Sequence, residues 1–320
     1  MSDIGITMLG SSGSGKTCYM LAMYAVMSTG IRGFTFTTQD PDDDLDLADD
    51  WERLEVNGTW PDPTTQSKDW LFDCSYGFKK IKGFKWHDYR GGALTDRSKP
   101  DDRKVLLQKF KNSSCIILCI SGEVLVDGRP RVPKEVRQFN TLMTQFRKET
   151  GKTVPVVIVV TKSDLCKDIK KGVEVIKENM LSTLFTQGSG WLTMICPVSL
   201  GTGSQDNFEV YPENVHLPVT FAIFHALQKD INDTLSAIKA NKRQVMNKQF
   251  EVNQLGNSLF KAWWNKGDIA DEQYAIESLQ QSTGLKEADC RTLQRNLELL
   301  KNELLGDNLY MYHDGRRFAL

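Results

Sequence analysis

The sequence predicts an α/β fold in two parts: a three-layer domain on a mostly parallel sheet with one antiparallel strand, followed by a C-terminal helical domain. Two observations carry this prediction. Short apolar runs alternate with helical stretches over residues 4–198, which is the pattern of a parallel sheet covered by helices. From about residue 218 onward the pattern is helical, without strands. The 320 residues are enough for both parts, which we place at residues 1–230 and 231–320.

Buried strands are expected where apolar residues form short continuous runs, at residues 4–9, 115–121, 154–161 and 191–198. Residues 70–75 and 78–88 are expected to pair as antiparallel strands, because Phe84 and Trp86 alternate with polar or small neighbours. Helices are expected over residues 19–27, 105–111, 133–150 and 170–183, the first of them ending near Gly30 as a glycine C-cap.

Residues 39–68 form a long polar region that begins with a run of aspartates: Asp40, Asp42, Asp43, Asp44, Asp46, Asp49 and Asp50. We expect a solvated surface loop there, with a short helix through Trp51 and Leu54. A cation site is the less favoured alternative, because runs of like charge are usually solvated.

The C-terminal part carries two helical stripes of apolar residues. The first consists of Phe224, Leu227, Ile231, Leu235 and Ile238, and the second of Leu293, Leu297, Leu300 and Leu304. We expect long helices packed as a hairpin; packing within the chain is favoured over a coiled coil with a partner, because the leucine seam spans only about two heptads. The tail, residues 308–320, is expected to form a small hairpin that turns at Asp314 and Gly315.

Composition and charge exclude several classes of function. The net charge is −1, which gives no global attraction to nucleic acid or to an acidic membrane. The seven cysteines form no close CxxC pair, which indicates a reduced, cytoplasmic protein. The N-terminus lacks the features of a signal peptide, and the apolar runs are too short to span a bilayer, so neither secretion nor membrane insertion is expected.

The run from Gly10 to Thr17 has the pattern Gly-x-x-x-x-Gly-Lys-Thr, between the first predicted strand and the first predicted helix. This is the pattern of a phosphate-binding P-loop, in which glycines let backbone N–H groups curl around phosphate oxygens. Lys16 would neutralise the β and γ phosphates, and Thr17 would offer its hydroxyl to Mg²⁺. The residues expected to bind the nucleotide here are Gly10, Ser12, Gly13, Ser14, Gly15, Lys16, Thr17 and Cys18.

Three further segments follow at predicted strand ends: residues 88–91 (Asp-Tyr-Arg-Gly), 161–164 (Thr-Lys-Ser-Asp) and 199–201 (Ser-Leu-Gly). Together with the P-loop they resemble the DxxG, [N/T]KxD and SAK-like elements of the Ras-like (TRAFAC) GTPases. The resemblance covers roughly residues 1–230 and implies a Ras-like P-loop domain. Residues 86–92 and the appended helices look most like the bacterial double-GTPase, or conflict-system GTPase, proteins.

Asp164 is expected to select the base, because its carboxylate can accept two hydrogen bonds from guanine N1–H and the 2-amino group, whereas adenine lacks these donors. Lys162 would lie along the face of the base, and Thr161 would tie this loop to the P-loop. Family members more often carry Asn at the Thr161 position. The third segment adds Ser199 and Leu200 to the expected nucleotide site. A helix-capping surface turn is the plainer alternative for residues 161–164.

The phosphate end is expected to hold Mg²⁺ through Thr17, Thr64 and Asp88, with Asp88 accepting from a metal-bound water. Thr64 is favoured over Thr65, because residues 62–64 resemble the Asp-Pro-Thr of Ras-like proteins. The backbone N–H of Gly91 would contact the γ-phosphate, so residues 92–101 are expected to behave as a switch. The residues expected to act in catalysis are Lys16, Thr64, Arg90 and Gly91.

One departure bears on activity. Ras-like enzymes that orient water through glutamine carry it directly after DxxG, where this chain has Gly92. Gln66, His87 or Arg90 could substitute, or hydrolysis is slow and is completed by a protein partner or by a second copy in a homodimer. We therefore expect a Mg²⁺-dependent GTP-binding switch with slow GTPase activity. An interaction module that binds nucleotide without a cycle, and a P-loop ATPase, are the alternatives.

Overall fold

The computed structural model describes residues 4–62, 64, 66–90, 94–95, 100–125, 132–201, 209–256, 266–306 and 309–320. The chain divides into two compact units. The first comprises the residues up to 223 together with 303–320, and the second comprises residues 224–302. The C-terminal segment therefore belongs to the first unit, whereas the sequence pattern grouped it with the helical extension.

A single mixed sheet forms the centre of the first unit, in the strand order β2-β3-β4-β1-β5-β6-β7-β8-β9. Strands β4, β1, β5, β6 and β7 are parallel neighbours. Strand β3 runs antiparallel to β2 and β4, and the C-terminal β8 runs antiparallel to β7. The strands are β1 (Ile4–Gly10), β2 (Phe34–Thr38), β3 (Lys68–Tyr76), β4 (Lys79–Asp88), β5 (Cys115–Ser121), β6 (Val156–Thr161), β7 (Leu192–Pro197), β8 (Tyr310–His313) and β9 (Arg316–Phe318).

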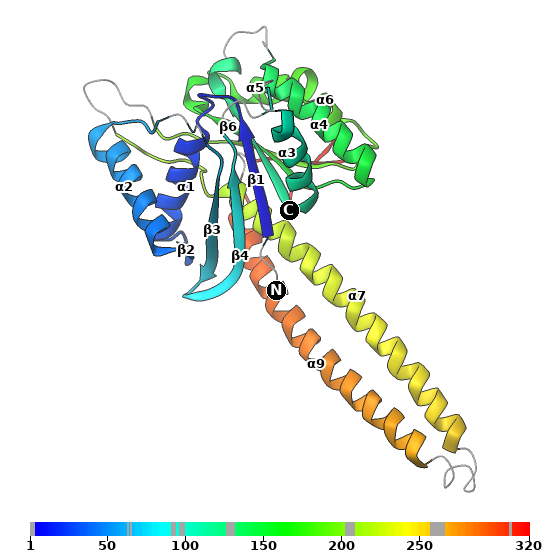
Figure 1. The fold of residues 1–320 in the computed structure, drawn as a ribbon. Coiled ribbons are helices and arrows are strands. Elements are labelled where there is room, and N and C mark those ends of the chain that lie inside the picture. The colour runs from blue at the N-terminus through cyan, green and yellow to red at the C-terminus, as the bar shows by residue number, and fades with distance from the viewer. Residues whose placement is uncertain are drawn as a thin grey trace. The chain divides into compact units, whose positions relative to one another are not determined.

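Helices cover both faces of this sheet, and Figure 1 shows α1 on one side and α3 and α4 on the other. The helices of the first unit are α1 (Lys16–Thr29), α2 (Pro41–Asn57), α3 (Pro100–Asn112), α4 (Lys134–Thr150), α5 (Ile169–Val175) and α6 (Ser182–Phe185), with a π-helical turn over Ile176–Met180. The expected helix at 170–183 is thus broken by the π turn. Every residue of β5 and β6 is buried, as expected for parallel strands that are covered on both faces.

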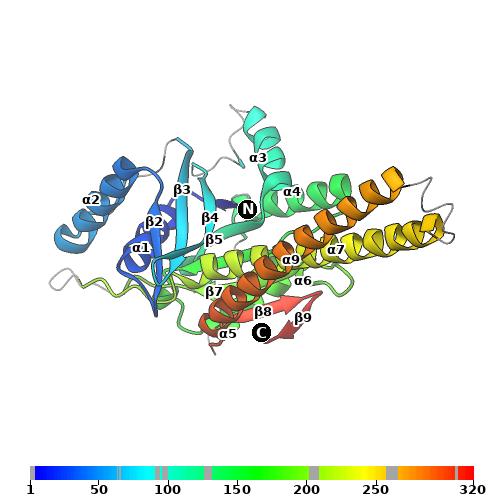
Figure 2. The ribbon, with the colours of Figure 1, turned by 90° about the horizontal axis from the view of Figure 1, so that it is seen from below.

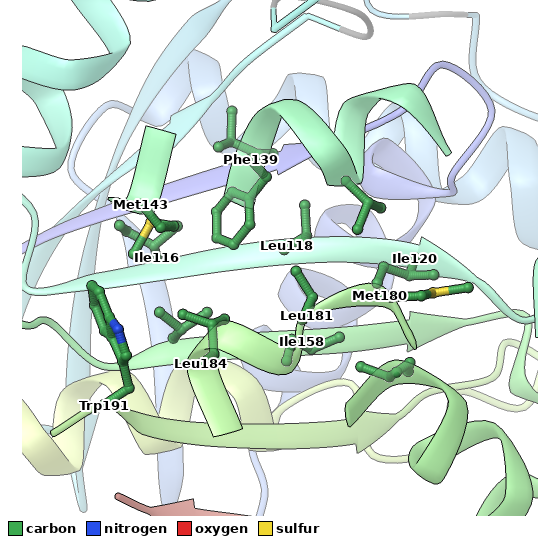
Figure 3. Packing of buried hydrophobic residues seen from close by; sticks show 14 of the residues in the cluster. Ile116, Leu118, Ile120, Phe139, Met143, Ile158, Met180, Leu181, Leu184 and Trp191 are labelled. Carbon is green, nitrogen blue, oxygen red and sulfur yellow. The ribbon is translucent and has the colours of Figure 1, made fainter. Parts of the chain in front are cut away.

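The main hydrophobic cluster lies between β5, β6 and the helices of one face (Figure 3). Ile116, Leu118 and Ile158 extend from the strands toward Phe139 of α4 and Leu184 of α6. Because side chains alternate between the two faces along a strand, Ile116 and Leu118 lie on the same face of the sheet, and Ile158 is paired with Leu118 on the neighbouring strand. The cluster therefore fixes β5 and β6, whose C-terminal ends carry the loops of the candidate site.

The aspartate run is helical rather than a surface loop. Asp40 caps α2 by accepting from the Asp42 backbone N–H at 3.0 Å, and Pro41 occupies the first helical position. Carboxylates in a first turn are favoured by the helix dipole. The expected short helix at Trp51 is therefore the second half of a helix that starts at residue 41.

The sequence interpretation also missed strand β2. Its sequence, Phe-Thr-Phe-Thr-Thr, alternates apolar and polar residues, and Phe34 and Phe36 are buried. The antiparallel pair β3–β4 forms as expected, with its turn at Gly77 and Phe78. The C-terminal hairpin turns at Asp314 and Gly315, also as expected, and continues the sheet beyond β7 (Figure 2).

The second unit is built from the long helices α7 (Leu217–Gly256), whose first residues belong to the first unit, and α9 (Lys266–Glu303). They run antiparallel, because Asn241 of α7 donates to Thr283 at 3.3 Å, whereas Lys248, further along α7, pairs with the earlier Glu272 at 2.6 Å. Ile231, Ile238, Leu293 and Leu300 of the predicted stripes are buried, whereas Leu235 is exposed. Among the helices that the structure describes, none is long and apolar enough to cross a membrane.

Candidate functional site

A cavity of about 890 Å³ opens at the C-terminal ends of β1, β5, β6 and β7. This is the end at which open α/β sheets bind ligands, and the volume suits a nucleotide-sized molecule. Its lining joins segments that are distant in the sequence. They are residues 12, 13 and 15–19; residues 57, 58, 60–62 and 64; Glu123; residues 161, 162, 164 and 165; and residues 200, 201, 209 and 210.

The P-loop has the backbone that its glycines allow. Gly15 has φ +76°, and a Cβ added there would lie 3.3 Å from the Thr161 Cβ. A Cβ on Gly10 would lie only 2.5 Å from the Ser14 Oγ. The Cβ on Gly10 would also lie 2.8 Å from the Cys119 backbone carbonyl oxygen, so close approach favours glycine at position 10. At position 15 the positive φ is the stronger reason for glycine.

Lys16 is the first residue of α1 and is only 5% exposed. Its Nζ donates to the backbone carbonyls of Gly10 and Ser11, at 3.1 Å each. The first turn of α1 contains no acidic residue, so the positive end of the helix dipole adds to the ammonium charge. A buried ammonium at a helix N-terminus is a favourable environment for phosphate.

Two threonine hydroxyls meet at the rim of this loop. The Oγ1 atoms of Thr17 and Thr64 lie 2.7 Å apart, and both residues line the cavity. Oxygen ligands in neighbouring positions of octahedral Mg²⁺ lie about 3.0 Å apart, given Mg–O distances near 2.1 Å. The hydroxyls therefore need little rearrangement to share a cation.

Asp88, the last residue of β4, is 3% exposed, and its buried Oδ1 has no hydrogen-bond partner among the residues that the structure describes. Burial raises the pKa of this carboxyl to about 7, although the nearby Lys16 lowers it in part. An unsatisfied buried carboxylate oxygen is costly and is relieved by a cation or by its water shell. The hydroxyls of Thr17 and Thr64 and the carboxylate of Asp88 are oxygen donors of the kind that a hard divalent cation such as Mg²⁺ prefers. Asp88 is not among the residues that line the cavity.

The loop after β6 is attached to the P-loop in the expected way. Thr161 Oγ1 donates to the Ser14 carbonyl at 2.6 Å. Lys162 has a left-handed backbone with φ +51°, and the Ser163 N–H donates to the Val198 carbonyl at 3.1 Å. Lys162 and Asp164 both line the cavity, so this loop can reach a ligand that is held by the P-loop.

The loop after β7 forms the remaining wall. Leu200 lines the cavity, whereas Ser199 is buried beside it and accepts from the Gly201 N–H at 2.9 Å. The chain returns along this loop, because the Tyr211 N–H donates to the Leu200 carbonyl at 2.8 Å. Val210 and Glu209 also line the cavity on this returning segment. The sequence interpretation missed them, since no motif marks residues 209–213.

Several predicted residues do not line the cavity. Gly10, Ser14 and Ser199 act from behind as packing or hydrogen-bonding groups. Arg90 is half-buried, and its backbone N–H donates to Ser67 Oγ at 3.2 Å. Gly91, Gly92, Thr65 and most of the expected switch at 92–101 lie outside the described residues.

His87 is not placed to replace the missing glutamine. Successive strand residues point to opposite faces, so His87 faces away from the side of Asp88. Its Nδ1 lies 2.5 Å from Asp69 Oδ1 and 3.3 Å from Lys109 Nζ. Gln66 is exposed and does not line the cavity.

Two carboxylates that the sequence interpretation missed connect the site to its surroundings. Glu123, just after β5, lines the cavity and pairs with Lys162 at 3.1 Å. Glu135, in the first turn of α4, accepts from Ser11 Oγ at 3.0 Å and from Thr95 Oγ1 at 3.3 Å. The available signal for Glu123 was its position at the end of a buried strand, where parallel sheets place ligand-binding residues.

No protein-family model matches the chain, and no curated protein matches it. Among solved structures, a bacterial selenocysteine-specific elongation factor, EF-Sec, is 13% identical with a TM-score of 0.33, over 62% of this chain and 26% of its own. The signal recognition particle receptor SRb–GTP/SRX complex from Chaetomium thermophilum is 14% identical with a TM-score of 0.36, and the match covers 65% of this chain and 95% of that one. The S. cerevisiae Ski7 GTPase-like domain, bound to GDP and inorganic phosphate, is 17% identical with a TM-score of 0.36, and the match covers 64% of this chain and 45% of that one.

The chain thus spans 26% and 45% of the lengths of the elongation factor and the Ski7 structure. The architecture itself carries the assignment of fold. A P-loop follows the central strand β1, one antiparallel strand, β3, precedes the strand that ends in Asp88, and the Thr-Lys-Ser-Asp segment follows β6. The first unit has the fold of a Ras-like P-loop GTPase domain.

Proposed function

We propose that this protein binds GTP and GDP with Mg²⁺, hydrolyses GTP slowly, and acts as a nucleotide switch for a protein partner. One observation carries the proposal: a single cavity brings the P-loop, the Thr17–Thr64 pair and Asp164 together. The P-loop would bind the phosphates, the two threonine hydroxyls the cation, and the Asp164 carboxylate the base. The enzyme activity within this proposal is conversion of GTP to GDP and phosphate.

Selection of guanine would rest on Asp164. Its carboxylate can accept hydrogen bonds from guanine N1–H and the 2-amino group, and neither donor exists on adenine. A site built around such an acceptor discriminates strongly, because the wrong base leaves the acceptor unpaired. The bond from Thr161 to Ser14 supports this role, since it holds the base loop at a fixed position against the phosphate loop.

Slow hydrolysis is proposed because no side chain is present at Gly92 and because His87 and Gln66 do not line the cavity. Lys16 would stabilise the charge that develops on the phosphates, and Thr64 would hold the cation in the triphosphate state. Arg90 and Gly91 complete the proposed catalytic set. A partner that supplies the missing group would accelerate the reaction.

The partner is proposed to be a protein effector or activator, or a second copy of the chain in a homodimer. A cytoplasmic location is part of this proposal, since the substrate nucleotides are intracellular. The resemblance to bacterial conflict-system GTPases supports a functionally linked partner only by analogy. The net charge of −1 gives no support for nucleic acid as the partner.

Calorimetry of GDP, GTP and ATP with and without Mg²⁺ tests the proposal. We expect tighter binding of guanine nucleotides than of ATP, and a dependence of GTP binding on Mg²⁺. Asp164→Asn should weaken guanine binding and favour xanthine, whose 2-oxo group accepts from the new amide. Tighter binding of ATP than of GTP, or unchanged guanine affinity in Asp164→Asn, would contradict the assignment of the base.

The absence of a side chain at Gly92 also supports a second candidate, a nucleotide-bound interaction module without a hydrolysis cycle. Single-turnover cleavage of GTP by the purified protein separates the two, since the module predicts no phosphate release over hours. A P-loop ATPase is the third candidate. It predicts that Lys16→Ala abolishes function whereas changes at Asp164 have no effect.

A further inference from the structure

The turn that follows β5 contains a group of contacts that none of the recognised motifs covers. Residues Gly122–Leu125 form a short 3₁₀ turn directly after Ser121. Ser121 is paired with Thr161 in the register of β5 and β6. The turn therefore lies beside the Thr-Lys-Ser-Asp loop, and Glu123 from this turn lines the same cavity as Lys162 and Asp164.

Both the carboxylate and the backbone N–H of Glu123 are hydrogen-bonded. Its Oε2 accepts from Lys162 Nζ at 3.1 Å and from Ser121 Oγ at 3.0 Å, and its backbone N–H donates to Ser121 Oγ at 3.3 Å. The hydrogen bond from Lys162 is the main reason that the pKa of Glu123 lies below its usual value. The carboxylate is thus charged and oriented by two neighbours.

Gly122 brings the two loops into backbone contact. A Cβ at this position would lie 2.4 Å from the Lys162 carbonyl oxygen and 3.2 Å from the Thr161 carbonyl oxygen. Only glycine allows so close an approach without moving one of the loops. The backbone of Lys162 is therefore supported by Gly122, and its ammonium is supported by Glu123.

We propose that Glu123 is a positioning residue that holds the side chain of Lys162 across the face of the bound nucleobase. The inference rests on the proposed function, because it needs a base in this cavity. Lys162 has four methylene groups between its backbone and its ammonium, and these can pack on an aromatic ring while the charged end stays in water. Fixing the ammonium on Glu123 reduces the rotamer freedom that binding would otherwise remove.

A plain surface ion pair is the competing account. The two side chains are 39% and 53% exposed, and exposed pairs contribute little to stability. The two accounts differ in which ligands they affect. A positioning role acts only on ligands that carry a base, whereas loss of a purely structural pair changes all ligands equally or none.

The test compares GDP with inorganic pyrophosphate, which occupies the P-loop but has no base. Calorimetry of Glu123→Ala is expected to show GDP binding weakened about three- to fivefold, the scale of a partly exposed ion pair. Pyrophosphate affinity should be unchanged. Glu123→Gln, whose amide oxygen can still accept from Lys162, should recover part of the GDP affinity.

Lys162→Met provides the second arm, because methionine keeps an unbranched stem but has no ammonium. In that background Glu123→Ala should have no further effect on GDP. Glu174→Ala is the matched control, since Glu174 pairs with Lys177 at a similar 3.0 Å away from the cavity. It should leave both ligands unaffected.

The inference is overturned if Glu123→Ala leaves GDP affinity unchanged, weakens pyrophosphate equally, or retains its effect with Lys162→Met. The proposed function fails separately, and visibly, if the unmodified protein binds pyrophosphate as tightly as GDP. In that case the base adds nothing to binding, and the unmodified protein alone contradicts the proposed function before any variant is measured.

Discussion

The hydroxyl oxygens of Thr17 and Thr64 lie 2.7 Å apart, although 47 residues separate them in the chain. Thr17 is in the first turn of α1, and Thr64 lies in the connection between α2 and β3. This contact places the connection at the phosphate end of the cavity. A cation shared by both hydroxyls would link bound nucleotide to the position of residue 64.

Replacing Thr64 by valine is therefore expected to weaken Mg²⁺-dependent GTP binding, because it removes the hydroxyl and keeps the shape. We expect the Mg²⁺ affinity of the GTP complex to fall by roughly tenfold, the scale found when a group around a bound metal is lost. Titration of Mg²⁺ against the GTP complex measures this. Thr65→Val is the control and should have little effect; the opposite ranking of the two variants would assign the role to Thr65.

Asp88 predicts a pH dependence of stability in the ligand-free protein. Its pKa is raised to about 7 by burial, so the folded state prefers the protonated carboxyl and the unfolded state loses that proton near pH 4. This group therefore stabilises the fold least above pH 7 and most below pH 4. Between pH 5 and 8 the free energy of unfolding should fall by roughly 2–3 kcal/mol relative to Asp88→Asn.

Urea unfolding at several pH values measures this difference. Asn has no titrating proton, so Asp88→Asn should show no such slope from this position. Saturating Mg²⁺ and GDP should reduce the slope of the unmodified protein, because a bound cation favours the ionised carboxylate. Parallel pH profiles for the two proteins without ligand would contradict the raised pKa.

The parallel strands were predictable because they are buried on both faces. The expected strand at residues 115–121 coincides with β5, Cys115–Ser121, and the P-loop fixes the start of α1 through its own pattern. The acidic run was misjudged for a physical reason. Its charges indicate solvent exposure, which is compatible with a helix as well as with a loop, and Asp40 and Pro41 are the actual helix-start signals.

The candidate site was predictable only where it depends on local motifs. Lys16 and Asp164 lie in such motifs, and both line the cavity. Glu123 and Val210 reach the cavity through tertiary placement of a turn after β5 and of a returning loop after β7. A single sequence contains no local pattern for such placement, since it depends on which loops the sheet order brings together.

The C-terminal hairpin is expected to contribute to the stability of the first unit. Tyr312 of β8 is buried in the main hydrophobic cluster and packs edge-on against Phe185, with ring centroids 5.2 Å apart. Tyr312→Ala should cost about 3 kcal/mol in the free energy of unfolding, the usual scale for deleting a buried aromatic ring. Tyr312→Phe keeps the ring and should cost far less. Equal losses for the two variants in urea unfolding would show that the ring packing is not the cause.

Glu135 is expected to couple the P-loop to the segment that follows Gly91, because its carboxylate accepts from both Ser11 Oγ and Thr95 Oγ1. Ser11→Ala and Thr95→Val should therefore have non-additive effects on the affinity for GTP, with a coupling energy of about 0.5 kcal/mol or more. Calorimetry of the double-mutant cycle measures this coupling. With Glu135→Ala the coupling should disappear, whereas Glu149→Ala, at the other end of α4, should preserve it. Additive effects in the unmodified background would mean that the two hydroxyls share a carboxylate without being coupled through it.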